Sequence, residues 1–307
     1  MKQRIAALFA GALLALALPG AAAAGPYEDG QAAYERHDYA AALKLRLPLG
    51  DEGDPRAQDD LGVMYEHGQG VPRDIQQAIV WYRKSAEQGY AEGQFDLALV
   101  YDAGQDVPQD YAEAAAWYRK AADQGYVTAQ YNLGSMYEHG QGVAQDYAQA
   151  ASWYRKAADQ GDPRSQANLG ALYAKGEGVK QDYEQSVAWL RKAADQGNAP
   201  AEANLGFAYS NALGVPQDDA EAYLWSRKAA DQGNAPAEAN LGFYYANGLG
   251  VPQDNIQALM WFNLAVAGAA DDSLRESAGK SRDALISKMT PSQVAEAERM
   301  ARERAPK

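Results

Sequence analysis

Apolar and small residues return along this sequence with helical spacing, inside units of constant length. In one half of a unit, Ala114, Trp117 and Tyr118 are spaced so that they share one helical face. In the other half, Leu133 and Tyr137 lie four positions apart and also share a face. Polar and charged residues fill most of the remaining positions. The pattern predicts two amphipathic helices in each unit.

The tryptophans give the length of the unit. Each of the six follows the previous one by 36 residues: Trp81, Trp117, Trp153, Trp189, Trp225 and Trp261. A constant period of this size is typical of proteins built from stacked repeats. Such chains grow along one axis and bury a continuous core between neighbouring units. We therefore expect an all-α solenoid of antiparallel helix pairs, with the tryptophans in its core.

Polar residues and glycines mark where the helices begin and end. Six aspartates are followed three residues later by Glu or Gln: Asp74, Asp110, Asp146, Asp182, Asp218 and Asp254. This is the spacing of a capping box, which predicts that a second helix begins after each aspartate. Gln-Gly pairs, as at Gly125 and Gly161, are expected to end that helix. Inside the first helix, a glycine such as Gly134 allows close approach of another helix.

The chain divides into four parts on these signals. Residues 1–24 are expected to form a signal peptide and residues 25–54 a degenerate helical hairpin. Residues 55–270 hold six repeat units, and residues 271–307 form helices that cap the C-terminal end. A solenoid needs atypical end units, because its terminal core faces are otherwise exposed.

The first 24 residues have the features of an export signal. Lys2 and Arg4 precede an apolar run, Pro19 and Gly20 interrupt it, and small residues follow up to Ala24. The apolar run is short for a membrane span, although an uncleaved anchor is the alternative. The sequence contains no cysteine, which excludes disulfides and lipid attachment through a thiol. We expect a bacterial periplasmic or secreted protein, with no membrane span after cleavage.

One unit, residues 129–161, carries the pattern Ala-x-x-Asn-Leu-Gly-x-x-Tyr-x-x-Gly-x-Gly-Val-x-x-Asp-Tyr-x-x-Ala-x-x-Trp-Tyr-Arg-Lys-Ala-Ala-Asp-Gln-Gly. This pattern resembles the SEL-one-like repeat (SLR), a relative of the tetratricopeptide repeat. The resemblance extends over about residues 30–290 and recurs six times. It implies antiparallel helix pairs stacked into a right-handed superhelix. It also implies that the protein acts as an adaptor for other proteins, often in the bacterial envelope.

Charge and composition narrow the possible ligands. The formal net charge of −13 disfavours binding to the phosphate backbone of nucleic acids. The three histidines have no metal-binding spacing, and no nucleophile motif is present. We therefore expect no metal, no cofactor and no catalytic residue, and a protein or peptide as the partner.

The candidate binding residues lie beside the repeated leucine of the first helix. The position before that leucine holds Asp60, Asp96, Asn132, Asn168, Asn204 and Asn240. In related tetratricopeptide proteins an asparagine at this position lines the concave surface, where its amide can bind a ligand backbone. The alternative is that these asparagines form hydrogen bonds between helices and hold the stack together.

Aromatic residues near these positions are candidate anchors for a partner. They are Phe95, Tyr131, Phe207 and Phe243. At the N-terminal end of the groove, Asp60, Glu66, Asp96, Asp102 and Glu138 favour a ligand with basic character.

We therefore expect an exported binding scaffold that engages a protein or peptide in its concave groove. One alternative is a cell-wall hydrolase that uses Glu66, Asp60 and Asp96. Because these acids recur as repeat positions and not as one fixed pair, the hydrolase is the weaker hypothesis. A purely structural spacer is the other alternative.

Overall fold

The computed structural model describes residues 25–304, and this part of the chain contains sixteen helices and no strand. The signal peptide predicted for residues 1–24 lies outside the described residues. The helices are α1 (Pro26–Glu35), α2 (Tyr39–Asp51), α3 (Pro55–His67), α4 (Ile75–Glu87), α5 (Ala91–Ala103), α6 (Tyr111–Asp123), α7 (Val127–His139), α8 (Tyr147–Asp159), α9 (Pro163–Lys175), α10 (Tyr183–Ala194), α11 (Ala199–Ser210), α12 (Asp219–Asp231), α13 (Ala235–Asn247), α14 (Asn255–Gly268), α15 (Asp272–Ile286) and α16 (Pro291–Arg304).

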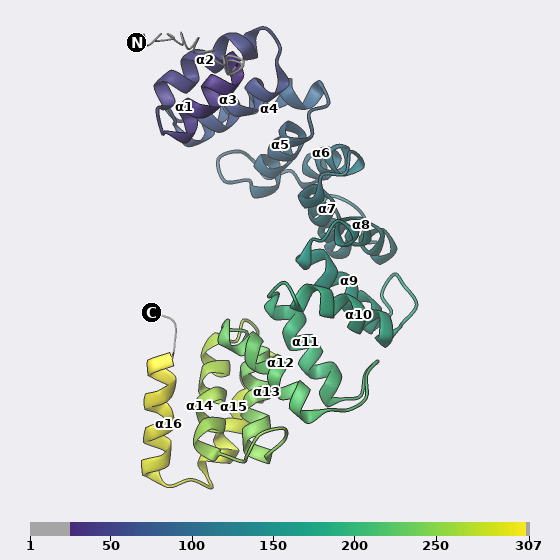
Figure 1. Ribbon diagram of the computed structural model, residues 1–307, viewed down its shortest axis with the longest axis vertical. Coiled ribbons are helices and arrows are strands. Elements are labelled where there is room, and N and C mark those ends of the chain that lie inside the picture. The colour runs from purple at the N-terminus through teal and green to yellow at the C-terminus, as the bar shows by residue number, and fades with distance from the viewer. Residues whose placement is uncertain (1–24, 305–307) are drawn as a thin grey trace, which may run out of the picture.

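Each helix from α1 to α15 packs mainly against its neighbours in the chain, whereas α16 packs against α14. The tightest pairs are the two helices of one unit, such as α3 with α4 and α11 with α12. Stacking these pairs gives an open arc whose two ends curve to the same side (Figure 1). At the C-terminal end, α14 is covered by both α15 and α16. The predicted all-α solenoid of helix pairs is confirmed.

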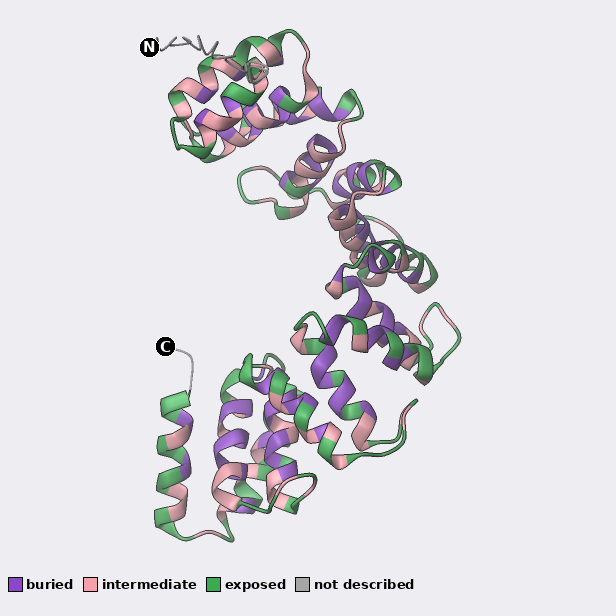
Figure 2. Cartoon of the chain, viewed as in Figure 1, coloured by how far each residue is buried: buried purple, intermediate pink, exposed green. Residues whose placement is uncertain are grey.

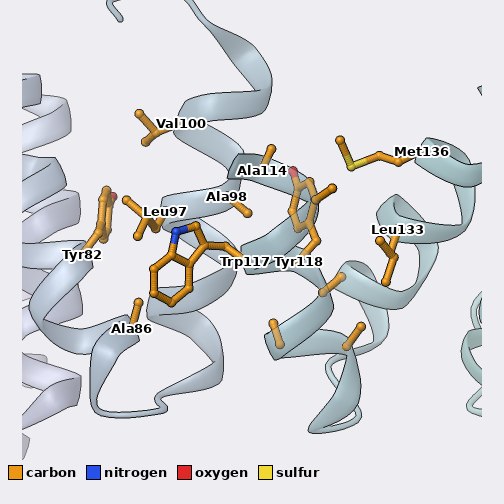
Figure 3. Close-up of a cluster of buried hydrophobic side chains, with 14 of the residues drawn as sticks. Tyr82, Ala86, Leu97, Ala98, Val100, Ala114, Trp117, Tyr118, Leu133 and Met136 are labelled. Carbon is orange, nitrogen blue, oxygen red and sulfur yellow. The ribbon is translucent and has the colours of Figure 1, made fainter. Parts of the chain in front are cut away.

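The core is a continuous seam between the helix pairs. All six tryptophans are buried, and so are the leucines that face them, including Leu97, Leu133 and Leu169. Figure 2 shows the buried faces turned towards neighbouring helices, with the loops and the outer side of α16 exposed. Figure 3 shows Tyr82, Leu97 and Trp117 gathered where the first two units meet. Consecutive units therefore share core residues.

The aspartates that begin the second helices act as caps, but only half of the expected capping box forms. Asp146, for example, accepts hydrogen bonds from the backbone N–H groups of Ala148 and Gln149. Its own backbone N–H donates to the carbonyl of Tyr137 in the preceding helix, at 2.9 Å. The same bond to a tyrosine carbonyl occurs in all six units. Because that carbonyl already satisfies the N–H, the Glu or Gln three residues later is left to other partners.

The glycine of the first helix fits against the second helix of the same unit. A Cβ atom at Gly134 would lie 2.7 Å from a ring carbon of Tyr154, which is too close for any real contact. Gly170 meets Leu190 in the same way, and Gly242 meets Phe262. In five of the six units the residue that follows the tryptophan is therefore held directly over the backbone of the first helix, and in the second unit Ala98 takes the place of the glycine. This contact fixes the distance between the helices of a unit.

Buried glutamines tie one unit to the next. The Gln94 side chain donates to the Ala86 carbonyl at the end of α4, at 3.1 Å, and accepts a bond from Gln124 at 2.8 Å. Gln130 and Gln166 repeat the bond to the carbonyl eight residues earlier. These bonds satisfy carbonyls that the end of a helix would otherwise leave buried and unpaired. The sequence analysis did not anticipate them.

Glutamates replace this glutamine in the last two units, at Glu202 and Glu238. Both side chains are buried. Gln232 donates to Glu202 at 2.8 Å, but the position that would face Glu238 in the same way is Gly268. Burial raises the pKa of Glu238 to about 7, and the positive charge of Arg304 opposes this only in part.

Basic side chains add further contacts along the second helices. Arg83 donates to the Tyr101 hydroxyl of the next unit at 2.8 Å, and Arg119 and Arg155 bond the corresponding tyrosines. The lysine that follows each of these arginines covers the tryptophan of its own unit, as Lys120 covers Trp117 at 3.4 Å from the ring centre. The repeated Arg-Lys pair therefore supports both the stack and the core.

A first prediction concerns the glycine contact. Gly134→Leu should lower the free energy of unfolding by about 1–3 kcal/mol, because the added side chain collides with Tyr154. Gly279→Leu is the matched control, since a Cβ at this helical glycine meets no atom within 4 Å. It should leave stability unchanged or raise it by up to about 1 kcal/mol, through better helix propensity. Urea unfolding followed by circular dichroism measures both, and equal destabilisation would contradict this account of the contact.

A second prediction concerns Glu238. Its pKa is about 7 in the folded chain and about 4.5 when unfolded, so the folded state binds the proton more tightly. The stability that protonated Glu238 gives to the folded state is fully present below pH 4.5, and it is lost as the pH rises through 7. Glu238→Gln should therefore raise stability at pH 8 by on the order of 1 kcal/mol, with less effect at pH 4.5. Thermal melting of this variant and of Gln166→Glu, which should show the opposite trend, checks the sign.

Candidate partner-binding groove

The predicted binding residues lie on the inner side of the arc. All of them belong to the first helices of the units, which are α3, α5, α7, α9, α11 and α13. Figure 1 shows α5 and α7 on the inside of the curve and α6 and α8 on the outside. The helices that carry these residues therefore form the inner side of the arc, and the surroundings of the individual side chains differ.

Tyrosine hydroxyl groups occupy the boundaries between the early units. Tyr82 donates to Glu66 at 2.6 Å, and Tyr154 donates to Glu138 at 2.6 Å. Tyr118 makes the equivalent bond to Asp102 at 3.1 Å. In each case the acid lies near the end of the first helix of the same unit. Three of the acids expected to attract a basic ligand thus already accept a hydrogen bond within the protein.

The asparagine of the following unit completes two of these clusters. Asn132 forms a hydrogen bond with Tyr118, and Asn168 forms one with Tyr154. Burial raises the pKa of both tyrosines, the neighbouring carboxylate raises it further, and the asparagine bond lowers it in part. We call each such set of three side chains a tyrosine–acid–asparagine cluster. At these two boundaries the asparagine of one unit lies beside the tyrosine of the preceding unit.

The boundary between the fourth and fifth units lacks two members of the cluster. Leu190 occupies the tyrosine position and Ala174 the acid position, while Asn204 remains. A pocket of about 480 Å³ opens here, and these three residues are part of its lining. The rest of the lining comes from Ala171, Lys175, Tyr183, Ser186, Phe207, Ala208 and Leu213. The loss of a phenol and a carboxylate leaves a mainly apolar pocket with one asparagine amide.

Smaller pockets occur at the equivalent place elsewhere in the stack. The pocket between the first two units measures about 280 Å³ and includes Glu66 and Leu99, which correspond to Ala174 and Phe207. The pocket between the sixth unit and α15 measures about 240 Å³ and includes Phe243 and Phe262. The repeat therefore places a pocket at a fixed position, and the residues of each unit set its size.

The four aromatic candidates fall into two groups. Phe207 on α11 and Phe243 on α13 are each 52% exposed. Phe95 instead packs between Tyr118 and Tyr126, with ring centres 5.7 and 5.0 Å away. Tyr131 lies between Tyr154 and the guanidinium of Arg164. The structure thus leaves the two later phenylalanines available to a ligand and uses the two earlier rings within the stack.

The remaining asparagine and the two aspartates have distinct surroundings. Asn240 is half-buried on α13, and the tyrosine position of the preceding unit is Ser226. Asp60 pairs with Arg46 of the N-terminal hairpin at 3.0 Å, and Arg46 is only 1% exposed. This ion pair attaches the hairpin to the first unit. Burial raises the pKa of Asp96, and the negative charges of Glu66 and Glu92 raise it further.

Asp59 was missed by the sequence analysis. It is 8% exposed and has a carboxylate oxygen with no hydrogen-bond partner. Burial raises its pKa, and the charge of Asp96 adds to the effect. The signal in the sequence was the change of residue type, since Phe95 and Tyr131 occupy the same position in the next two units.

Two observations bear on the alternative of a metal site or a hydrolase. They contain no group of three or more His, Asp or Glu side chains arranged to hold a metal ion. Of the acids considered for a hydrolase, Glu66 bonds Tyr82 and Asp60 bonds Arg46. None of the helices in residues 25–304 is both long enough and apolar enough to cross a membrane.

The family comparison agrees with the repeat boundaries seen in the fold. The Sel1 repeat model matches residues 55–90, 91–126, 127–162, 163–198, 199–234 and 235–268. Among curated proteins, none matches this sequence at a significant level.

Two solved structures are similar over most of the chain. One is a protective antigen of uropathogenic Escherichia coli strains that displays an SLR fold, with 35% identity and a TM-score of 0.80. That match covers 91% of this chain but only 60% of the E. coli protein. The other is a Sel1 repeat protein from Oxalobacter formigenes, with 34% identity, a TM-score of 0.70, and coverage of 79% of this chain and 97% of that one. With six consecutive matching repeats, this chain belongs to the Sel1 repeat family.

Proposed function

We propose that this protein is an exported bacterial scaffold that binds a protein or peptide partner in its concave groove. The observation that carries the proposal is the pocket between the fourth and fifth units, which has Asn204 in its lining and the exposed ring of Phe207 beside it. Proteins with Sel1 repeats generally act as scaffolds for protein–protein interaction. A large, mainly apolar pocket with a few polar groups is the usual form of a binding site.

The surroundings of the pocket suit an extended segment of a partner. Phe207, Phe243 and Leu99 lie at one repeat position and are each at least 44% exposed, so apolar side chains recur along the inner face. Exposed aromatic residues next to a pocket are frequent anchors in protein interfaces. The Asn204 amide offers one donor group and one acceptor group to a peptide backbone.

Support for export comes from the N-terminal sequence. The basic start, the apolar run and the small residues before Gly25 have the order of a signal peptide. An acidic chain without cysteine is compatible with an oxidising compartment and with high solubility. We place the mature protein in the periplasm or among the secreted proteins of a bacterium.

The proposal predicts a difference between two equally exposed residues of the fifth unit. Phe207 on α11 is 52% exposed and Leu224 on α12 is 53% exposed. Peptides selected from a random displayed library should bind Phe207→Ala about tenfold or more weakly, since aromatic hot spots contribute about 2 kcal/mol or more. Leu224→Ala should bind them with unchanged affinity. Isothermal titration calorimetry measures both, and both variants should melt within a few degrees of the parent.

Two results would contradict binding in the groove. Loss of binding in Leu224→Ala with retention in Phe207→Ala would move the partner to the outer face and overturn the groove. A library that yields no binding peptide for the intact chain would favour the structural spacer instead.

Export has a test of its own. When the full sequence is expressed in a Gram-negative host, the protein should collect in the periplasm with Gly25 as its first residue, as read by intact mass. A Leu13→Arg, Leu14→Arg variant should remain in the cytoplasm, because charges interrupt the apolar run. An uncleaved chain that sediments with membranes would show that residues 1–24 act as an anchor.

A further inference from the structure

We propose that the pocket between the fourth and fifth units binds a tyrosine side chain of the partner. The inference rests on the proposed function and names the residue type that the groove selects.

The fourth unit boundary differs from the second and third in the side chains that meet there. At the second and third boundaries, a tyrosine of the second helix points its hydroxyl between an acid and the asparagine of the next unit. At the fourth boundary the same three positions are Leu190, Ala174 and Asn204, and all three line the pocket. At the first boundary, where Tyr82 and Glu66 are both present, the equivalent pocket is smaller, at about 280 Å³, so we attribute the larger volume at the fourth boundary to the missing phenol and acid.

Asn204 is the one member of the tyrosine–acid–asparagine cluster that is present at the fourth boundary. Asn132 and Asn168 are half-buried and hydrogen-bonded to tyrosine hydroxyl groups. Asn204 is exposed, and its counterpart Leu190 has no hydroxyl group. A phenol that enters from a partner can accept the hydrogen bond that Asn132 and Asn168 give to tyrosines of this chain. A ligand side chain that lacks an oxygen atom cannot accept this hydrogen bond from the Asn204 amide.

The size and polarity of the pocket match those of a phenol ring. A volume of about 480 Å³ accommodates an aromatic ring together with part of its backbone. Leu190, Ala171 and Leu213 provide apolar walls for the ring. Lys175 also lines the pocket, but its ammonium pairs with Glu177 at 3.5 Å, so the Asn204 amide is the donor that complements the electronegative phenol oxygen. The favoured occupant is thus an aromatic ring that carries a hydroxyl group.

A double variant can rebuild the tyrosine–acid–asparagine cluster at the fourth boundary with side chains of the protein itself. Ala174→Glu combined with Leu190→Tyr copies the pair found at Glu138 and Tyr154 into the fourth unit. Its tyrosine should fill the pocket, so the chain should fold with an unchanged or higher melting temperature and lose its ligand. The matched control is Ala246→Glu with Phe262→Tyr, which makes the same change two units later and should keep binding at the fourth boundary.

N-acetyltyrosinamide and N-acetylphenylalaninamide serve as probes, titrated by NMR against the intact mature chain. The tyrosine probe should bind at least about fivefold more tightly, as expected for one hydrogen bond of about 1 kcal/mol. It should shift the side-chain amide signal of Asn204. Asn204→Ala should reduce its affinity to that of the phenylalanine probe, whose own affinity should not change.

Each contrary result has a defined meaning. Equal affinity for the two probes, absence of binding, or retained binding by the folded Ala174→Glu, Leu190→Tyr variant would overturn the proposal. If that variant fails to fold, Asn204→Ala decides alone, because this exposed side chain can be truncated without opening the core. Selected peptides that bind in the groove but lack tyrosine would overturn the tyrosine pocket while leaving the scaffold function intact. Self-association of the chain through one of its own tyrosines, seen by sedimentation, would also count against a separate partner.

Discussion

The contact between a backbone and a side chain inside each unit governs the rest of this structure. A glycine of the first helix, such as Gly134, receives the residue that follows the tryptophan, here Tyr154, at a distance that leaves no room for a Cβ atom. The helices of a unit are held together at this point, and the tip of the same side chain reaches the next unit. The identity of one residue thus determines both the packing within a unit and the character of the boundary beyond it.

Where that residue is Tyr118 or Tyr154, its hydroxyl donates to an acid of the same unit, and where it is Leu190, a pocket of about 480 Å³ opens at the boundary. The concave face is therefore not a uniform surface. Its N-terminal half is occupied by bonds that the protein makes with itself, including the Arg46–Asp60 ion pair. Its C-terminal half presents exposed phenylalanine rings and the large pocket. This division gives the groove a direction, which an extended ligand can recognise.

Much of the fold could be predicted because every unit repeats the same local signals. The tryptophans, the capping aspartates and the glycines each act within one or two turns of helix, and six copies make their spacing unmistakable. The candidate site was harder to predict because it lies where one unit departs from the repeated sequence pattern. Asn168 and Asn204 look alike in sequence, yet one is bound to Tyr154 and the other lines a pocket. The difference comes from Leu190 and Ala174, which lie on other helices and are distant from Asn204 in sequence. The glutamine bonds between units were missed for the same reason, since they join residues 30 positions apart.

The tryptophans of this chain have an optical consequence. In the first five units a lysine ammonium lies within 4 Å of the centre of the indole ring. Trp261 differs, because Leu264 stands in the place of that lysine and Arg304 of α16 lies 4.4 Å from the ring centre. Among the described residues, undocking of α16 would remove a cation from the ring of Trp261 and from no other tryptophan, so a change in tryptophan emission can report on this helix with no label attached to the protein.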